Sequence, residues 1–287
     1  MALTLMMSLS LNGPLRAKAA TWKQIWSDEF NGAANTGVNT SNWLTNTGTS
    51  YPGGAANWGT GEVETMSSST TNVYQDGVGH LIIKPTLNGG TWTSGRIETQ
   101  STFSAPSGGQ LAVEASIQLF PGLIGSATQG YWPAFWMLGA AFRGVYTNWP
   151  RIGEIDAMEN INGRNTVYGT LHCGIAQGGP CNEKTGLQGH ASCLPDCQGT
   201  FHTYRVEIDR STSPEEIRWY LDGVQYWQVS SNHVGMDATT WANAVDHEFF
   251  LLLNVAIGGE WAGNPTASTT FGAPMVVDYV RVFTSAM

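Results

Sequence analysis

Residues 151–163 read RIGEIDAMENING, a strand-like, largely apolar segment that carries three carboxylates. These are Glu154, Asp156 and Glu159. Acidic residues are rarely buried without a partner or a function. Side chains alternate along a strand, so Glu154 and Asp156 share a face, whereas unbroken alternation would turn Glu159 away from it. One extra residue at positions 157–158, a β-bulge, would return Glu159 to that face. The segment therefore predicts a bulged strand with three acids in one groove.

The same strand-like pattern continues through most of the chain. Apolar segments such as LAVEASIQLF, FFLLLNVAI and MVVDYVRVF are short, and Gly-rich polar turns separate them. Within residues 112–119 apolar and polar side chains alternate, which is typical of a half-buried strand. The pair Asp222 and Gly223 in YLDGVQY predicts a tight hairpin turn. No segment predicts a long helix, so we expect an all-β sandwich of two curved antiparallel sheets with a concave substrate cleft.

The composition of the 287-residue chain limits its partners. It carries 13 Lys and Arg against 22 Asp and Glu, a net charge of −9. Such acidity argues against nucleic acid or an anionic membrane as a partner. The 12 Trp residues suit a neutral ligand, because an indole ring can stack on a sugar ring, although many aromatic residues serve only the core.

The first 20 residues resemble a targeting segment. MALTLMMSLSLNGPLRAKAA has an apolar run followed by small residues, as at a signal-peptidase site near Ala19 or Ala20. A membrane anchor would need an apolar run of about 20 residues, which this segment lacks. We therefore expect residues 1–20 to be a signal peptide, the protein to be secreted, and residues 21–287 to form a single domain.

All four cysteines lie in one loop-like stretch. They are Cys173, Cys181, Cys193 and Cys197. An even number of clustered cysteines in a secreted chain indicates two disulfides, for which three pairings are possible. A zinc site with His172 or His190 is the alternative, but the spacing matches no familiar zinc motif.

Two uses would explain three acids on one face of a strand. The first is structural: the acids lie on a solvated edge strand or bind Ca²⁺, although Ca²⁺ ligands usually come from loops that also supply Asn and carbonyl groups. Alternatively, two carboxyl groups about 5–5.5 Å apart cleave glycosidic bonds with retention of configuration. A third acid between them would raise the pKa values of its neighbours and orient them. The apolar neighbours of the three acids favour glycosidic cleavage.

The motif GEIDAMEN (residues 153–160) resembles the signature of glycoside hydrolase family 16, in the form with an additional residue that is typical of laminarinases. GYWPAFWMLG, TSGRI, FHTYRVEIDRS and LLLNVAIGGEW resemble further segments of the family, and MVVDYVRVF resembles its closing strand. The likeness spans residues 22–283. It implies a jelly-roll sandwich that forms the catalytic domain of a secreted endo-β-1,3-glucanase acting on laminarin-like chains.

The resemblance also implies a role for each acid. Glu154 matches the nucleophile, Glu159 the acid/base, and Asp156 the assisting residue between them. Glu159 would protonate the leaving oxygen while Glu154 attacks the anomeric carbon. Glu159 would then deprotonate the water that releases the sugar. Catalysis of this kind requires no cofactor.

A set of aromatic and polar residues is predicted to bind the substrate. Trp132 and Trp136 lie four apart, on one face of a strand. Trp58 and Trp149 lie in loops, where an aromatic side chain is harder to explain as core. The resemblance adds further residues, and the complete set is Trp132, Trp136, Arg96, His172, Trp58, Trp149, Asn57, Glu62, Asn254 and Trp261. The alternatives are core packing for the aromatics, a surface ion pair for the arginine and a structural role for the histidine.

A structural Ca²⁺ site is implied near the ends of the chain. WSDEFNG and VVDYVRVF match strands that hold this ion on the convex side in many members of the family. Asp278 would supply its carboxylate and Glu29 a backbone carbonyl. The alternative is that Asp278 caps an ordinary strand pair.

Other functions remain open at this point. Within the family, a mixed-linkage β-1,3-1,4-glucanase, another polysaccharide hydrolase or a transglycosylase would share these motifs. A β-glucan-binding, lectin-like module is the non-enzymatic alternative, but such relatives lose the catalytic acids and this chain keeps all three. We expect a monomer whose partner is a polysaccharide.

Overall fold

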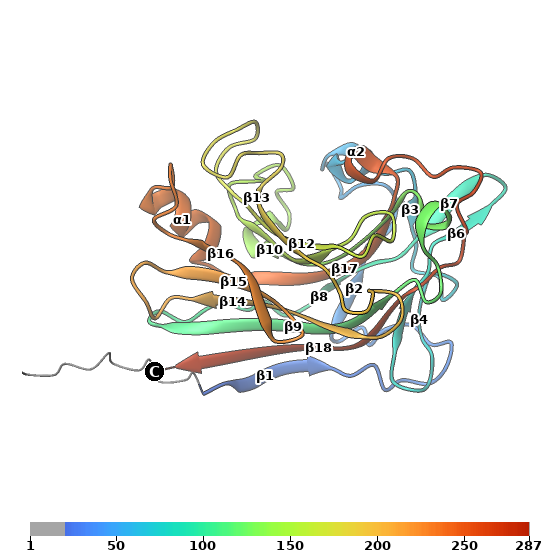
Figure 1. Ribbon diagram of the computed structural model, residues 1–287, viewed down its shortest axis with the longest axis horizontal. Helices are drawn as coiled ribbons and strands as arrows, with labels where there is room; N and C mark the ends of the chain where they lie inside the picture. The colour runs from blue at the N-terminus through green and yellow to red at the C-terminus, as the bar shows by residue number, and fades with distance from the viewer. Residues whose placement is uncertain (1–20, 287) are drawn as a thin grey trace, which may run out of the picture.

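Two antiparallel β-sheets make up most of the computed structural model, which describes residues 21–286 (Figure 1). The predicted all-β sandwich is confirmed. The predicted signal peptide lies outside the described residues.

The first sheet has the strand order β16-β15-β14-β9-β18-β5-β4, and β1 pairs with β18 beside this path. Its strands are β1 (Lys23–Asp28), β4 (Val73–Gln75), β5 (Leu81–Ile83), β9 (Gly109–Leu119), β14 (His202–Asp209), β15 (Glu216–Leu221), β16 (Val224–Ser230) and β18 (Met275–Ala286).

The second sheet has the order β13-β12-β11-β10-β17-β8-β2, and a small third sheet has the order β3-β7-β6. The strands of the second sheet are β2 (Trp43–Thr45), β8 (Arg96–Thr99), β10 (Tyr131–Gly139), β11 (Glu154–Glu159), β12 (Val167–His172), β13 (Leu187–Ala191) and β17 (Phe249–Ile257). Those of the third are β3 (Thr65–Met66), β6 (Thr86–Asn88) and β7 (Thr91–Ser94).

The helical segments are short, as expected for this sequence. They are α1 (Ala238–Val245), α2 (Gly259–Ala262) and the 3-10 turns η1 (Ala56–Gly59), η2 (Gly125–Thr128) and η3 (Ala140–Phe142). Among the described residues, no helix is long and apolar enough to cross a membrane.

Apolar side chains of the two main sheets form the core between them. On β9, Val113, Ala115 and Ile117 are buried while Glu114 is partly exposed, which confirms the predicted alternation. Strand β17 is buried along its whole length because it lies between β10 and β8 inside the second sheet.

The hairpin predicted at Asp222 and Gly223 is confirmed. Leu221 pairs with Val224, and the two turn residues have φ values of 51° and 77°. Positive φ at both central positions matches the right-handed twist of the flanking strands. The turn joins β15 to β16 at the edge of the first sheet.

One buried hydrogen bond ties the first sheet to the centre of the second. The indole Nε1 of Trp219 on β15 donates to the backbone carbonyl of Asp156 on β11 at 2.7 Å. Gly169 on β12 makes room for this indole, since a Cβ there would lie 2.3 Å from the Trp219 ring. The core thus fixes the backbone of the strand that carries the three acids.

Candidate active site

The predicted bulge in the acidic strand is confirmed. On β11, Asp156 pairs with Thr170 and Glu159 with Tyr168, so three steps along β11 match two steps along β12. The pairing with β10 shifts at the same place. A bulge adds one residue to one strand and re-aims the side chains beyond it. Glu159 therefore faces the same cleft as the other two acids.

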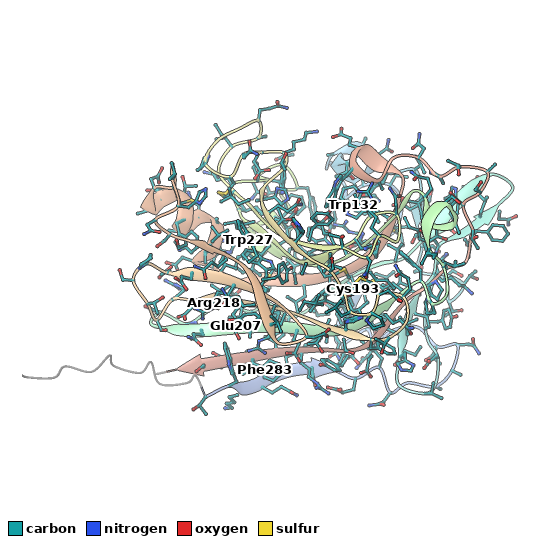
Figure 2. The ribbon with its side chains drawn as sticks, viewed as in Figure 1. Trp132, Cys193, Glu207, Arg218, Trp227 and Phe283 are labelled. Atoms are coloured by element: carbon teal, nitrogen blue, oxygen red, sulfur yellow. A yellow bond between two sulfur atoms is a disulfide. The ribbon has the colours of Figure 1, made fainter. Side chains whose placement is uncertain are left out.

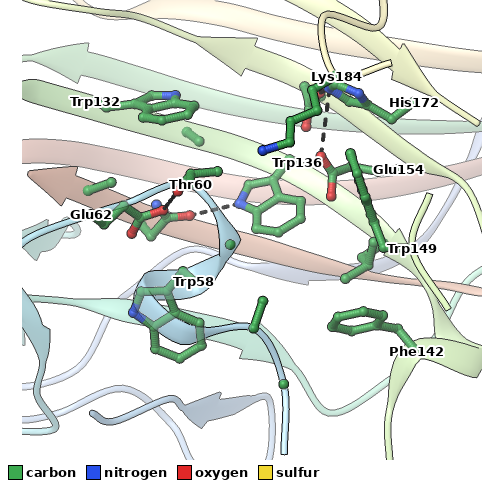
Figure 3. Close-up of a pocket in the computed structure, with 18 of the residues that line it drawn as sticks. Trp58, Thr60, Glu62, Trp132, Trp136, Phe142, Trp149, Glu154, His172 and Lys184 are labelled. Carbon is green, nitrogen blue, oxygen red and sulfur yellow. Dashed lines mark hydrogen bonds and ion pairs between the residues drawn. The ribbon is translucent and has the colours of Figure 1, made fainter. Parts of the chain in front are cut away.

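A cavity of about 770 Å³ lies over this face of the second sheet (Figure 3). All three acids line it, together with most of the predicted substrate-binding residues. The predicted residues that line the cavity are Trp58, Glu62, Arg96, Trp132, Trp136, Trp149, His172, Asn254 and Trp261. The strand alternation of Trp132 and Trp136 thus does place both rings on the cleft side.

Asn57 differs from the other predicted residues, because it is exposed and does not line the cavity. Its φ is 52°, a left-handed conformation that asparagine tolerates better than most residues. Its carbonyl accepts the backbone N–H groups of Thr60 and Gly61. The residue closes a turn, and that turn presents the neighbouring Trp58 to the cleft.

Burial and mutual repulsion govern the charge of the three acids. Burial, followed by the charges of Glu159 and Glu183, raises the pKa of Glu154 to about 7, although His172 and Arg96 oppose this rise. Burial and the neighbouring carboxylates raise the pKa of Asp156 well above its ordinary value. Few of the surrounding groups carry a positive charge, so the pKa values of the acids lie above those of exposed carboxyl groups.

Glu159 is held by an indole rather than by a cation. Nε1 of Trp132 donates to Oε1 of Glu159 at 2.8 Å. Burial raises the pKa of Glu159, while this hydrogen bond and the charge of His172 oppose the rise. Trp132 also packs edge-on against Trp261, with 5.6 Å between ring centroids. The arrangement fixes Oε1 of Glu159 against the indole of Trp132.

Arg96 is buried among aromatic rings and is not part of a surface ion pair. Its guanidinium lies 4.5 Å from the ring centroid of Trp58 and 4.9 Å from that of Trp136. Trp136 in turn donates its Nε1 to Oδ1 of Asn254 at 2.7 Å. These contacts orient polar and aromatic faces along the floor of the cleft. Glu62 accepts from the Thr60 hydroxyl at 2.7 Å beside them.

His172 bridges the acids and a loop carboxylate. Its Nε2 lies 3.4 Å from Oδ2 of Asp156 and 3.8 Å from Oε1 of Glu154. Its Nδ1 lies 2.8 Å from Oε2 of Glu183. Burial alone would lower the pKa of His172, but the hydrogen bond to Glu183 and the nearby carboxylate charges raise it above its ordinary value. These contacts favour the protonated form of His172 beside the acids.

Sequence reasoning missed several residues of the cleft. Tyr51, Phe142 and Tyr146 line it, and Tyr51 stacks on Tyr146 with 4.6 Å between ring centroids. The same signal that selected the loop tryptophans, an aromatic residue in a polar loop, also marks the two tyrosines. Lys184 lines the cleft as well, and as a single charged loop residue it gives no such signal.

The four cysteines form two disulfides, as predicted. The pairs are Cys173 with Cys181 and Cys193 with Cys197. Because all four sulfurs are bonded to one another in pairs, the zinc alternative does not hold.

Among the described residues, one group of three His, Cys, Asp or Glu side chains is close enough together to hold a metal ion. Glu154, Asp156 and His172 offer ligand atoms within 4.8 Å of one another. The ion pairs of His172 already account for this grouping, and we assign the three side chains to acid–base chemistry.

Comparisons with known proteins identify relatives that match nearly the whole chain. A family model described as "XgeA-like, catalytic GH16 domain" matches residues 56–203. The chain is 30% identical to the Beta-glucanase of Rhodothermus marinus over 98% of this chain and 92% of that protein. It is 33% identical to Glucan endo-1,3-beta-glucosidase A1 of Niallia circulans over 96% of this chain, but spans only 40% of that protein.

The solved structures add a near neighbour. The endo-1,3-beta-glucanase from Streptomyces sioyaensis is 54% identical, with a TM-score of 0.91, over 95% of this chain and 100% of that chain. This likeness confirms the predicted jelly-roll class of the sandwich.

Proposed function

Because the chain belongs to glycoside hydrolase family 16, we propose that it hydrolyses internal bonds of a laminarin-like β-1,3-glucan with retention of configuration. One observation carries the proposal: three buried acids share one face of a bulged strand inside a cleft lined with tryptophans. The printed names of the relatives support β-1,3-glucan as the substrate.

The first half of the reaction forms a covalent sugar. A carboxylate oxygen of Glu154 attacks the anomeric carbon, and the bond from that carbon to the leaving oxygen breaks. Glu159 gives its proton to the leaving oxygen, so the shortened chain departs as an alcohol. The raised pKa of Glu159 keeps that proton in place until it is needed, while Trp132 holds the other carboxyl oxygen.

The second half reverses the roles. Glu159, now a carboxylate, takes a proton from water, and the water oxygen attacks the anomeric carbon and displaces Glu154. Asp156 lies between the two glutamates, and its strongly raised pKa makes it a proton holder that lets Glu154 carry the negative charge. His172 and Arg96 stabilise that charge electrostatically.

The test is product analysis combined with removal of the nucleophile. The wild-type protein should release reducing sugars from laminarin, with weaker release from lichenan and none from agarose or carrageenan. Glu154→Gln should abolish release while glucan binding, followed by tryptophan fluorescence, is kept. NMR of the first products should show the β-anomer. An active Glu154→Gln variant would refute the assignment of the nucleophile.

We also propose that the protein acts outside the cell as a monomer on its polysaccharide. Two disulfides support an oxidising location, where such bonds persist. Expression of the full chain should yield secreted protein that begins near Ala19 or Ala20, as read by N-terminal sequencing. Size-exclusion chromatography with light scattering should give the mass of one chain, and a dimer mass would contradict the monomer.

A structural Ca²⁺ at Asp278 completes the proposal. The pairing of β1 with β18 ends where Asp28 lies opposite Val280, and Glu29 follows directly. Nearby on β18, the register with β9 shifts at Asp278. The Glu29 carboxylate pairs with Arg281 at 2.8 Å, so its backbone carbonyl is the group left for a cation. Asp278 and Glu29 would hold the ion. EDTA should lower the melting temperature and Ca²⁺ restore it, and Asp278→Asn should remove this response. An unchanged melting temperature would refute the site.

A further inference from the structure

We propose that Glu183, a loop residue outside the three acids, is a positioning residue that holds His172 against Glu154 and Asp156. The inference rests on the proposed glycosidase function. It adds a residue that acts through His172 and does not touch the reacting atoms itself.

Glu183 holds His172 and Cys173 with its two carboxylate oxygens, an arrangement that we call the Glu183 clamp. Its side chain is completely buried, with 0% of it exposed. Oε2 accepts from Nδ1 of His172 at 2.8 Å, and Oε1 accepts the backbone N–H of Cys173, the next residue, at 2.8 Å. Both carboxylate oxygens are thus used on one histidine and its neighbour. The opposite ring nitrogen is left facing the acids.

The loop that carries Glu183 is itself fixed. The Cys173–Cys181 disulfide closes it two residues before Glu183. The backbone of Glu183 exchanges two hydrogen bonds with Gly178, at 2.6 and 2.7 Å. Gly186 packs so closely that a Cβ there would lie 2.9 Å from the His172 ring. A carboxylate held this firmly can set the orientation of a ring without reorganising.

The charges around His172 define what the clamp does. The carboxylates of Glu154, Asp156 and Glu159 face the ring from β11, and Glu183 faces it from the loop. The ammonium of Lys184, next to Glu183, pairs with Glu260 at 3.3 Å, and the Trp149 ring lies 5.6 Å from the imidazole. With Nδ1 bound to Glu183, the Nε2 edge of the His172 ring is directed toward the acids.

Glu183 acts on the pKa of Glu154 in two ways: directly, by charge repulsion, and indirectly, through His172. The larger of the two effects decides whether this pKa rises or falls when Glu183 is lost. The charge of His172 lowers the pKa of Glu154 by more than the charge of Glu183 raises it. Loss of Glu183 would remove the smaller, direct repulsion and, by lowering the pKa of His172, would weaken the larger attraction. The net effect is a higher pKa for Glu154, and for Glu159, whose pKa His172 also lowers.

The chain contains a matched control for this clamp. Nδ1 of His202 on β14 lies 2.7 Å from Oδ2 of Asp222, in the turn between β15 and β16. Oδ1 of Asp222 accepts the N–H of Thr203, the residue after His202, at 2.9 Å. The other ring nitrogen, Nε2, lies 2.9 Å from the carbonyl of Asp196 and not near a catalytic acid. The two carboxylates hold their histidines in the same way, but only His172 lines the cleft.

The experiment compares Glu183→Gln with Asp222→Asn on laminarin. In Glu183→Gln, kcat/KM should fall about 10-fold at the wild-type optimum, and both limbs of its pH profile should move upward by about 0.5–1 pH unit. Glu183→Asp, which keeps the charge, should move the limbs back toward the wild type. Asp222→Asn should lower the melting temperature and leave the limbs in place. A purely structural Glu183 would lower the melting temperature without moving the limbs, and that result would overturn the inference.

If Glu183→Gln fails to fold, a measurement on the wild-type protein tests the same inference. NMR titration of the wild-type protein should show His172 holding its proton above the ordinary imidazole pKa of about 6.5. Titration of His172 at or below that value would overturn the inference. A wild-type protein that is inactive on every glucan would instead refute the proposed function, while the titration would still test the clamp.

Discussion

The two sheets of the sandwich use the same acidic residues in opposite ways. The outer face of the first sheet pairs its acids with arginines, as in Arg205 with Glu207 at 2.9 Å and Arg218 with Asp209 at 2.7 Å. The cleft face of the second sheet gathers its acids with few cations, chiefly His172 and Arg96. Figure 2 labels Glu207 and Arg218 on the first sheet and Trp132 on the second.

The pKa directions follow this difference. Burial would raise the pKa of Asp209, but hydrogen bonds from Ser211 and Arg218 outweigh it, and the pKa falls below its ordinary value. In the cleft, burial and the neighbouring carboxylates outweigh the charges of His172 and Arg96, and the pKa of Glu154 rises to about 7. The first sheet therefore gains stability from its charges, whereas the cleft keeps reactive protons at the expense of stability.

The largest effect should come from removing the proton donor. Glu159→Gln should lower kcat on laminarin by about 100- to 10,000-fold, the range of a positioned general acid. An aryl glucoside with a good leaving group should lose far less activity, because it needs no proton at that oxygen. Glu207→Gln, on the paired sheet, is the matched control and should keep full activity. Equal losses on both substrates would contradict the acid role of Glu159.

The raised pKa of Glu154 predicts that the inactive variant Glu154→Gln is more stable than the wild type. The folded-state pKa of Glu154 is raised, so the folded chain binds more protons than the unfolded chain between about pH 4 and pH 7. Stability is therefore lost as pH rises through this window, by up to about 3 kcal/mol above pH 7. Glu154→Gln should unfold at higher urea than the wild type at pH 8, with no difference at pH 4. A variant destabilised at both pH values would contradict this.

Asp209 should respond in the opposite sense. Its pKa is lowered in the folded state, so its contribution is present above the unfolded value near 3.9 and lost as pH falls through the folded value. Asp209→Asn should cost about 1 kcal/mol at pH 7 and progressively less toward pH 2, as followed by urea unfolding. A cost that grows on acidification would show that the Arg218 pair does not stabilise the fold.

The centre of the cleft was predictable because it depends on spacing within single strands. The interval between Asp156 and Glu159 required a bulge, and four positions between Trp132 and Trp136 placed both rings on one side. The periodicity of a strand carries this information locally. The three acids of residues 151–163 could therefore be identified without knowledge of any long-range contact.

The rim of the cleft depends on loops, and local spacing does not describe them. Asn57 was expected to face the substrate, yet it closes a turn and points to solvent. Local spacing gives no signal for Glu183, because its role arises only when a disulfide-closed loop folds back onto β12. The pairing of the cysteines, too, depended on tertiary structure, since several pairings satisfied the same sequence.

The smallest effect should come from the ion pair of Lys184 and Glu260, which joins the two rims of the cleft at 3.3 Å. Unlike the arginine pairs of the first sheet, its side chains are 49% and 66% exposed. Water and salt screen such a pair, and two long side chains lose freedom to form it. Lys184→Ala should therefore change the free energy of unfolding by less than about 0.5 kcal/mol, and 1 M salt should erase the change. A salt-resistant loss of more than about 1 kcal/mol would show that pairing stabilises the cleft rim as it does the outer sheet.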